Sequence, residues 1–263
     1  MTEENYLFLK KYQKLQLSIA YDALTDVDFA IIGSSKLDPS VYWNSALTDQ
    51  ILSDDQIGVV EAIFADLERI PTFYYENKPK LNDLSTRLKS RGYEESFEDS
   101  WLFWTSQSID TKHFESVRKV NTKVDLELFL KTLDASYQVD DPQNPYGELG
   151  EYLESARRAW EDNHISGKVE YFIVFKSDTP VSVASLTNYR GIGYISNVGS
   201  LKEVRGEGYG KAATHFCVNE SLSKGNSAHC LATEEGDYPN EFYKRIGFKD
   251  AFRAIAYTKY ELR

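Results

Sequence analysis

The sequence predicts an α+β fold in which a mixed, mainly antiparallel sheet is flanked by helices, with two such domains in tandem. Three observations support this prediction. Short strands separated by turn residues follow one another in the C-terminal part, amphipathic helices precede and follow them, and the N-terminal part has a similar order of elements. We place the domain boundary near residue 113. Residues 1–113 then form a degenerate copy or an accessory domain, and residues 114–263 form the second domain.

Length, composition and charge limit the classes of protein to consider. The chain has 263 residues, 41% of them hydrophobic and 14% aromatic, which suffices for one or two packed cores and is too apolar for a disordered chain. The net charge is -11, and most of it lies in residues 1–113, which hold 11 Lys and Arg against 19 Asp and Glu. A protein that binds a phosphate backbone would have the opposite sign, so we expect no nucleic-acid partner. No apolar stretch approaches the roughly 18 residues of a membrane span, so we expect no membrane partner.

The two cysteines, Cys217 and Cys230, indicate the compartment. They are too few for a disulfide framework and lack metal-ligand spacing. We therefore expect two buried thiols, no metal site and a cytoplasmic location, with a single disulfide as the less favoured alternative.

Two helices are predicted at the beginning of the C-terminal part. Residues 116–124 form a possible short strand, and Asp125 is the expected N-cap of a helix whose apolar residues recur at helical spacing through Leu133. In a second helix, residues 149–160, the apolar side chains fall on one face. The segment 141–145, rich in Asp, Asn and Pro, is predicted to be the loop between these helices.

Three strands follow in close succession, at residues 171–175, 181–186 and 192–201. Asp178-Thr179-Pro180 forms the first turn between them and Arg190-Gly191 the second. Because strands joined by short turns pair in opposite directions, these three are expected to be antiparallel.

The most informative segment is residues 205–211, Arg-Gly-Glu-Gly-Tyr-Gly-Lys, which stands between the third strand and a helix. Glycines at such a turn let the backbone approach a ligand, and the free amides of the first helical turn then point at an anion. A pyrophosphate would suit this loop. A dinucleotide-binding turn is a poorer match, because the glycine spacing differs and the preceding strands are antiparallel, and a kinase loop would lead into a strand.

The elements after this helix complete a pattern that is similar to a known family. A strand is predicted at 227–233, a short helix at 239–245 and a last strand at 251–260. The loop and this order resemble the GNAT superfamily of acetyl-CoA-dependent N-acetyltransferases. The family's signature of Arg or Gln, two residues, Gly, one residue, and Gly or Ala is met by Arg205-Gly-Glu-Gly208-Tyr-Gly210. The family's later Tyr and Gly-Phe pair are met by Phe242-Tyr243-Lys-Arg-Ile-Gly247-Phe248.

The resemblance covers roughly residues 115–263 and implies a site for acetyl-CoA as co-substrate. Backbone groups of Val198, Gly199 and Ser200, on a strand that splays from its neighbour, would hold the pantetheine arm and polarise the thioester carbonyl. Tyr243 matches the tyrosine that protonates the departing thiolate in many members, and a phenol with an ordinary pKa of about 10 suits that role. The pyrophosphate would be bound by backbone amides of Arg205, Gly206, Glu207, Gly208, Tyr209, Gly210 and Lys211.

One departure from the family and one open assignment remain. Many members carry an Asn seven residues before the tyrosine, where this chain has Gly236, so the resemblance does not extend to that cofactor contact. No family position singles out the general base, and a solvated or packed side chain is the more ordinary explanation for each candidate. The candidates are Glu203, Glu234, Glu235 and His229.

The N-terminal part repeats the order of elements without showing chemistry of its own. Asp55 and Gly92 are 37 residues apart, as are Gly210 and Gly247. In this alignment Ser53 and Asp55 replace the two required glycines, and carboxylates there would repel a pyrophosphate. We therefore expect one acetyl-CoA site, in the C-terminal domain, and chance is the alternative to a tandem repeat.

The predicted function is an N-acetyltransferase, an acyltransferase that moves an acetyl group from acetyl-CoA to a primary amine by direct attack in a ternary complex. The alternative is a non-catalytic module on the same fold that senses acetyl-CoA or binds a protein, because the glycine loop must be intact in both. A longer acyl donor stays open. The sequence identifies neither the acceptor, a small molecule or a peptide, nor the oligomeric state.

Overall fold

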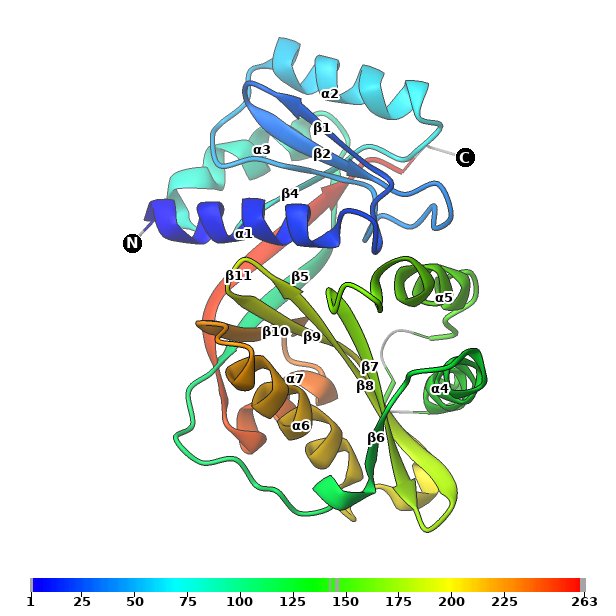
Figure 1. Ribbon diagram of the computed structural model, residues 1–263. Helices are drawn as coiled ribbons and strands as arrows, with labels where there is room; N and C mark the ends of the chain where they lie inside the picture. The colour runs from blue at the N-terminus through cyan, green and yellow to red at the C-terminus, as the bar shows by residue number, and fades with distance from the viewer. Residues whose placement is uncertain (1, 142, 145–146, 261–263) are drawn as a thin grey trace. The chain divides into compact units, whose positions relative to one another are not determined.

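The α+β prediction is confirmed by the computed structural model, which describes residues 2–141, 143–144 and 147–260 (Figure 1). Strands pair mainly in the antiparallel sense, and helices flank them. Within the described residues, no helix is both long and apolar enough to cross a bilayer.

The chain divides into two units. Unit 1 contains the described residues up to Trp101 and from Ala251 onward, and unit 2 runs from Leu102 to Asp250. Two strands, β5 (Glu94–Trp104) and β11 (Phe248–Thr258), have residues in both units. The units therefore assign the last strand largely to unit 1, and the division into domains 1–113 and 114–263 stays a prediction.

The strands of unit 1 lie in the order β1-β2-β3-β4-β11-β5, with β3 and β4 parallel. β11 pairs antiparallel with β4 from Ala254 to Thr258. Neither α1 nor the β1–β2 hairpin was predicted from the sequence, because α1 is polar over most of its length and the hairpin strands are short. The elements before β5 are α1 (Thr2–Gln16), β1 (Ala23–Val27), β2 (Ala30–Ser34), β3 (Ser45–Leu47), α2 (Asp54–Asp66), β4 (Thr72–Glu76), the 3-10 turn η1 (Pro79–Leu81) and α3 (Asn82–Ser90).

The core of unit 1 forms between its helices and its sheet. α2 and α3 have apolar residues at helical spacing, and these face the strands. Burying each such side chain contributes about 1.5–3 kcal/mol. The buried cluster includes Ile57, Val60 and Phe64 of α2, Leu84 and Leu88 of α3, and Phe73 and Tyr75 of β4.

The strands of unit 2 lie in the order β5-β10-β9-β8-β7-β6. Figure 1 shows α4 and α5 on one side of β7–β9 and α6 on the other. β9 and β10 are parallel, whereas β6 to β9 form an antiparallel meander as predicted. The elements are η2 (Phe114–Ser116), β6 (Val117–Lys119), α4 (Lys123–Ser136), α5 (Tyr152–Asn163), β7 (Val169–Lys176), β8 (Thr179–Tyr189), β9 (Ile192–Ser200), η3 (Lys202–Val204), α6 (Tyr209–Ser223), β10 (Ala228–Glu234) and α7 (Tyr238–Ile246).

Two boundaries at the start of unit 2 differ from the sequence expectation. The strand predicted at 116–124 is limited to β6, because α4 begins at Lys123. The N-cap of α4 is Thr122, and the assignment of Asp125 as N-cap was wrong. Asp125 stands at the third helical position, where its carboxylate accepts a hydrogen bond from the Thr122 amide at 3.0 Å while its own amide donates to the Thr122 hydroxyl at 3.1 Å. This reciprocal capping box starts the helix three residues earlier than expected.

The predicted repeat appears in the element order. Unit 1 has the sequence β3-α2-β4-α3, and unit 2 has β9-α6-β10-α7, each with a parallel strand pair. The chain turns after α3 at Gly92, with φ of +85°, and after α7 at Gly247, with φ of +119°. Left-handed backbone of this kind favours glycine, which explains why both positions carry it.

The cysteine prediction is also confirmed. Cys217 of α6 and Cys230 of β10 are both free thiols and both buried. Burial raises the pKa of each thiol well above its ordinary value, so both behave as small apolar core residues.

Candidate functional site

Unit 2 contains a cavity of about 330 Å³ beside the glycine loop. Its wall is formed by the end of α4, the second half of β9, the first turn of α6 and one face of α7. Glu207 is the predicted site residue that does not contribute to the wall, and its carboxylate pairs with Lys176 at 2.8 Å. The predicted residues that line the cavity are Val198, Gly199, Ser200, Arg205, Gly206, Gly208, Tyr209, Gly210, Lys211 and Tyr243.

The backbone of the glycine loop leaves a set of amides open. Gly206 and Gly208 have φ of +83° and +100°, which turns the chain into α6 with Gly208 as N-cap. The amides of Arg205 and Glu207 are used inside the turn, on the carbonyls of Lys202 and Val204 at 3.4 and 3.2 Å. Within the described residues, no protein acceptor is found for the amides of Gly206, Gly208, Tyr209, Gly210 and Lys211.

Two glycines of the wall allow neighbouring elements to approach closely. A Cβ at Gly210 would lie 2.8 Å from Oγ of Ser200, and one at Gly199 would lie 2.7 Å from Cβ of Ser136. Real Cβ atoms do not approach other atoms so closely, so a larger residue at either position would displace β9, α4 or α6. The close approach of β9 to the first turn of α6 thus depends on Gly210, and the close approach of β9 to the end of α4 depends on Gly199.

β9 changes its pairing where it borders the cavity. Its parallel pairing with β10 covers three residues and ends at Tyr194, although β9 continues to Ser200. On the other side a β-bulge shifts the register with β8 between Val183 and Ser185, and Asn197 in the bulge has φ of +52°. Such a bulge redirects the backbone of the bulged strand, here at the residues predicted to contact the thioester.

Two tyrosines from α4 and α5 hold the bulge in place, and sequence reasoning missed both. The Tyr137 hydroxyl donates to the carbonyl of Val198 at 3.2 Å, and the Tyr152 hydroxyl donates to Oδ1 of Asn197 at 2.6 Å. Burial raises the pKa of Tyr137 to about 12, so this hydroxyl stays a donor at neutral pH. No local pattern could have paired either residue with β9, since the contacts span 45 or more positions of sequence.

Arg205 forms a buried ion pair with Asp141. Its guanidinium donates to Oδ1 of Asp141 at 2.7 Å, and only 5% of the Asp141 side chain is exposed. The hydrogen bond from Arg205 lowers the pKa of Asp141 below its ordinary value. Of the loop predicted at 141–145, Asp141, Gln143 and Asn144 are described, whereas Pro142 and Pro145 lie outside the described residues. Sequence reasoning gave Asp141 no role beyond the loop.

Lys211, on the first turn of α6, pairs with Asp110. The Nζ–Oδ2 distance is 2.8 Å, and the hydrogen bond from Lys211 lowers the pKa of Asp110 to about 2. His215 is fixed nearby by two backbone groups: its Nδ1 accepts from the Asp110 amide at 3.1 Å and its Nε2 donates to the Ile246 carbonyl at 2.9 Å. Because both ring nitrogens are bound to backbone groups, His215 has a structural role, and burial lowers its pKa.

Tyr243 lies on α7 and lines the same cavity as the glycine loop. Its side chain is 7% exposed and packs edge-on against Phe242 at 5.1 Å and Phe248 at 5.8 Å between ring centroids. Rings packed in this way fix the direction of the phenol, so its position relative to the cavity is set by the core of unit 2.

Residues 132–248 match the family model of the GNAT acetyltransferases. The chain carries a GNAT-family domain. The resemblance inferred from the glycine loop and the Tyr and Gly-Phe segment is therefore confirmed, and both motifs lie inside the matched residues. No curated protein matches the chain in sequence.

Solved structures share the fold over most of the chain. A GCN5-related N-acetyltransferase from Kribbella flavida is 15% identical with a TM-score of 0.65, and the match covers 94% of each chain. A functionally unknown conserved protein from Staphylococcus epidermidis is 13% identical with a TM-score of 0.64, covering 93% of this chain and 96% of the other. A tandem GNAT protein from the clavulanic acid biosynthesis pathway is 13% identical with a TM-score of 0.54, covering 87% and 77%. At these identities the likeness shows the fold alone.

The four candidate bases do not line the described wall of the cavity in the GNAT domain. Glu203 is exposed in η3, Glu234 is the last residue of β10, and Glu235 follows it. His229 is buried, and its Nδ1 lies 2.7 Å from the hydroxyl of Ser221. Burial also lowers the pKa of His229, so it stays neutral. The geometry favours none of them as the base.

Proposed function

We propose that the GNAT domain transfers an acetyl group from acetyl-CoA to a primary amine by direct attack within a ternary complex. The observation that carries this proposal is the cavity of unit 2, which brings together the open amides of the glycine loop, the bulged end of β9 and Tyr243. A phosphate-binding turn, a strand edge and a proton donor are the parts that this reaction requires from a protein.

The glycine loop fits a pyrophosphate. Within the described residues, the amides of Gly206, Gly208 and residues 209–211 have no protein acceptor, and the helix dipole adds partial positive charge at this end of α6. No acidic residue occupies the first turn of α6. Gly210 and Ser200 lie so close that a side chain at position 210 would fill the path between loop and strand.

The end of β9 fits the pantetheine arm and the thioester. Acetyl-CoA supplies the acetyl group as a thioester, whose carbonyl carbon can accept an amine. Backbone groups of Val198, Gly199 and Ser200 border the cavity and would orient the arm, and an amide of this strand would stabilise negative charge on the carbonyl oxygen. The contacts from Tyr137 and Tyr152 hold this backbone in place before any ligand binds.

Tyr243 would hold the proton that the departing thiolate takes up. A phenol with an ordinary pKa of about 10 carries that proton at pH 7, and Tyr243 is one of the α7 residues that line the cavity. The packing of its ring against Phe242 and Phe248 limits the rotation of the phenol. Water is the simplest route for the proton that leaves the amine, since no candidate base lines the described wall.

The experiment that tests this function has two steps. Acetyl-CoA at about 100 times its Kd should raise the melting temperature by roughly 5 to 10 °C, because it binds the folded state alone. Release of the CoA thiol is then measured with polyamines, aminoglycosides, amino acids and peptides as acceptors. Release with any amine supports the enzyme, binding without release on every amine supports the sensing alternative, and no thermal shift contradicts an acetyl-CoA site.

A further inference from the structure

Glu207 anchors the glycine loop to the body of unit 2, although it does not line the cavity. Its amide donates to the carbonyl of Val204 at 3.2 Å. Its two carboxylate oxygens accept hydrogen bonds from Nζ of Lys176 on β7, at 2.9 and 2.8 Å. Its carbonyl oxygen lies 3.3 Å from Nε2 of His113. Backbone and side chain of this loop residue are therefore all bound within the protein.

His113 contacts three consecutive residues of the loop. Besides the contact with Glu207, its ring stacks on the ring of Tyr209, with 4.5 Å between centroids and 25° between planes. Its Cδ2 lies 3.9 Å from the Cβ position of Gly208. A carbonyl oxygen can only accept, so Nε2 carries the proton in the hydrogen bond to Glu207.

The turn that carries His113 is fixed independently of the glycine loop. His113 has φ of +68°, a left-handed conformation that His adopts more readily than most residues. Its carbonyl accepts from the Ser116 amide at 3.0 Å. The next residue, Phe114, packs edge-on against Phe216 of α6, with 5.1 Å between ring centroids. The imidazole is thus presented to the loop from a turn that packs on α6.

Planarity of the peptide bond connects His113 to the open amides. In a trans peptide the carbonyl of Glu207 and the amide of Gly208 lie in one plane and point in opposite directions. Because His113 holds the carbonyl, the Gly208 amide points away from His113. Gly208 lines the cavity, and His113 is not on its described wall.

We propose that His113 is a positioning residue, which holds the Glu207 carbonyl and so directs the Gly208 amide at the anion in the loop. This inference rests on the proposed function, because it takes that anion to be the pyrophosphate of acetyl-CoA. Without His113 the peptide is free to rotate, and ordering it on binding costs affinity. Lys176 contributes less, because its ion pair with Glu207 is exposed on both sides.

The test separates the hydrogen bond from the ring contact. His113→Phe keeps a ring to stack on Tyr209 but cannot donate, whereas His113→Gln keeps an N–H donor of similar reach and loses the ring. His164→Phe is the matched control, since His164 also stacks on a ring, that of Trp160 at 3.7 Å, and contacts a backbone carbonyl at 2.8 Å. It lies outside the described cavity wall. If His113→Phe does not fold, His113→Asn replaces it, because Asn tolerates left-handed backbone and is too short to reach Glu207.

Two quantities are measured for each protein. Calorimetric titration gives the Kd for acetyl-CoA, and amide spectra of protein labelled with ¹⁵N-glycine follow the assigned Gly208 signal. His113→Phe should weaken acetyl-CoA binding by about five- to tenfold, His113→Gln should restore the Kd to within about twofold, and His164→Phe should leave it unchanged. In the wild type the Gly208 proton should shift downfield on binding, because it donates to an anion, and in His113→Phe this shift should fall by about half or more.

Each outcome supports or overturns the proposal. An unchanged Kd in His113→Phe, or a Gly208 shift equal to that of the wild type, overturns the positioning role and leaves the proposed function standing. A purely structural His113 would lower the melting temperatures of His113→Phe and His113→Gln alike without changing the Gly208 shift, which also overturns it. If the wild type does not bind acetyl-CoA, the proposed function fails, and this inference fails with it.

Discussion

The first turns of α2 in unit 1 and α6 in unit 2 occupy equivalent places in the repeat but are used in opposite ways. In unit 1, Ser53 caps α2: its hydroxyl accepts from the Gln56 amide at 3.2 Å, and the Gln56 side chain accepts from the Ser53 amide at 2.8 Å. In unit 2, Gly208 caps α6 with no side-chain hydrogen bond. The same helix terminus is thus satisfied by the protein in one unit and left open to a ligand in the other.

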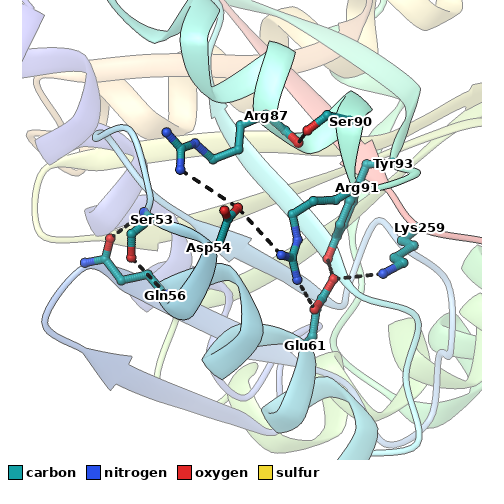
Figure 2. Close-up of polar contacts among 9 residues, drawn as sticks. All are labelled: Ser53, Asp54, Gln56, Glu61, Arg87, Ser90, Arg91, Tyr93 and Lys259. Atoms are coloured by element: carbon teal, nitrogen blue, oxygen red, sulfur yellow. Dashed lines mark hydrogen bonds and ion pairs between the residues drawn. The ribbon is translucent and has the colours of Figure 1, made fainter.

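The charged residues around the two first turns also differ. The first turn of α2 carries Asp54 and Asp55, and Asp54 lies 3.6 Å from Arg91 (Figure 2). Nearby, Glu61 accepts hydrogen bonds from Arg91 and Lys259 at 2.7 and 3.0 Å. Burial alone would raise the pKa of Glu61, but these bonds lower it below its usual value. Arg91 and Lys259 are therefore paired with carboxylates of unit 1, and the absence of a cofactor from this copy stays a prediction.

The position of the proposed acid differs as well. Tyr243 stands four residues before Gly247, and in the aligned repeat Leu88 stands four residues before Gly92. Leu88 is fully buried in the core of unit 1, whereas Tyr243 reaches a cavity. A repeat that lost its ligand could use this position for packing, because nothing there had to remain polar.

The largest expected effect comes from giving α6 the acidic first turn of α2. Gly210→Asp places a carboxylate and a Cβ where loop and strand are closest, so repulsion and steric overlap both oppose the pyrophosphate. Affinity for acetyl-CoA should fall by about 100-fold or more, roughly 2.7 kcal/mol, in calorimetric titration.

Gly58→Asp is the matched control, since Gly58 lies in α2 with open space around its Cβ position. This variant should bind acetyl-CoA as the wild type does. Unchanged affinity in Gly210→Asp would show that the loop is not the phosphate site.

Removing the phenol of Tyr243 should have the next largest effect. Tyr243→Phe keeps the ring and its packing but removes the proton donor, so turnover should fall by about 10- to 100-fold while the Kd for acetyl-CoA stays within about twofold. Thiol release under saturating conditions measures turnover, and calorimetry measures the Kd for acetyl-CoA. Tyr189→Phe, outside the cavity wall at the end of β8, serves as control. Turnover equal to that of the wild type would remove Tyr243 from the mechanism.

Asp141 should make the stability of unit 2 depend on pH. Its pKa is lowered in the folded state, so the ion pair stabilises the protein above the unfolded value of about 4 and this contribution is lost as pH falls through the folded value. Asp141→Asn should lower the free energy of unfolding by about 1–2 kcal/mol at pH 6 and by less at pH 3, because Arg205 loses its partner.

Urea unfolding of both proteins at the two pH values measures this difference. If the free energies of unfolding of the variant and the wild type differ by the same amount at pH 6 and pH 3, Asp141 is not ionised in the pair.

The smallest effect is expected at the cap of α2. Ser53→Ala removes the hydroxyl that accepts from Gln56, which should lower the free energy of unfolding by about 1 kcal/mol. Acetyl-CoA affinity should not change, since unit 1 holds no cofactor in our proposal. A weakened affinity in this variant would contradict that assignment, and thermal unfolding with and without ligand provides both readouts.

Local signals in the chain were sufficient for much of this description. The meander of β7 to β9, the glycine loop before α6 and the helix before Gly247 follow from strand alternation, turn residues and helical spacing, all of which act between near neighbours. The residues predicted for the cofactor and acid roles have these same local origins, and all but Glu207 line one cavity. Their roles stay predictions until binding and turnover are measured.

What the sequence determined by itself is the order of elements in the C-terminal part, the family and the glycine turn before α6, because each depends on residues a few positions apart. Only the tertiary structure decided the pairing of Arg205 with Asp141, the support of the β9 bulge by Tyr137 and the pairing of β11 with β4. These contacts join residues far apart in the chain, and their energy exists only once the sheet and helices have brought them within hydrogen-bond distance. For the same reason the sequence could name four candidate bases, whereas the fold places none of them on the described wall of the cavity.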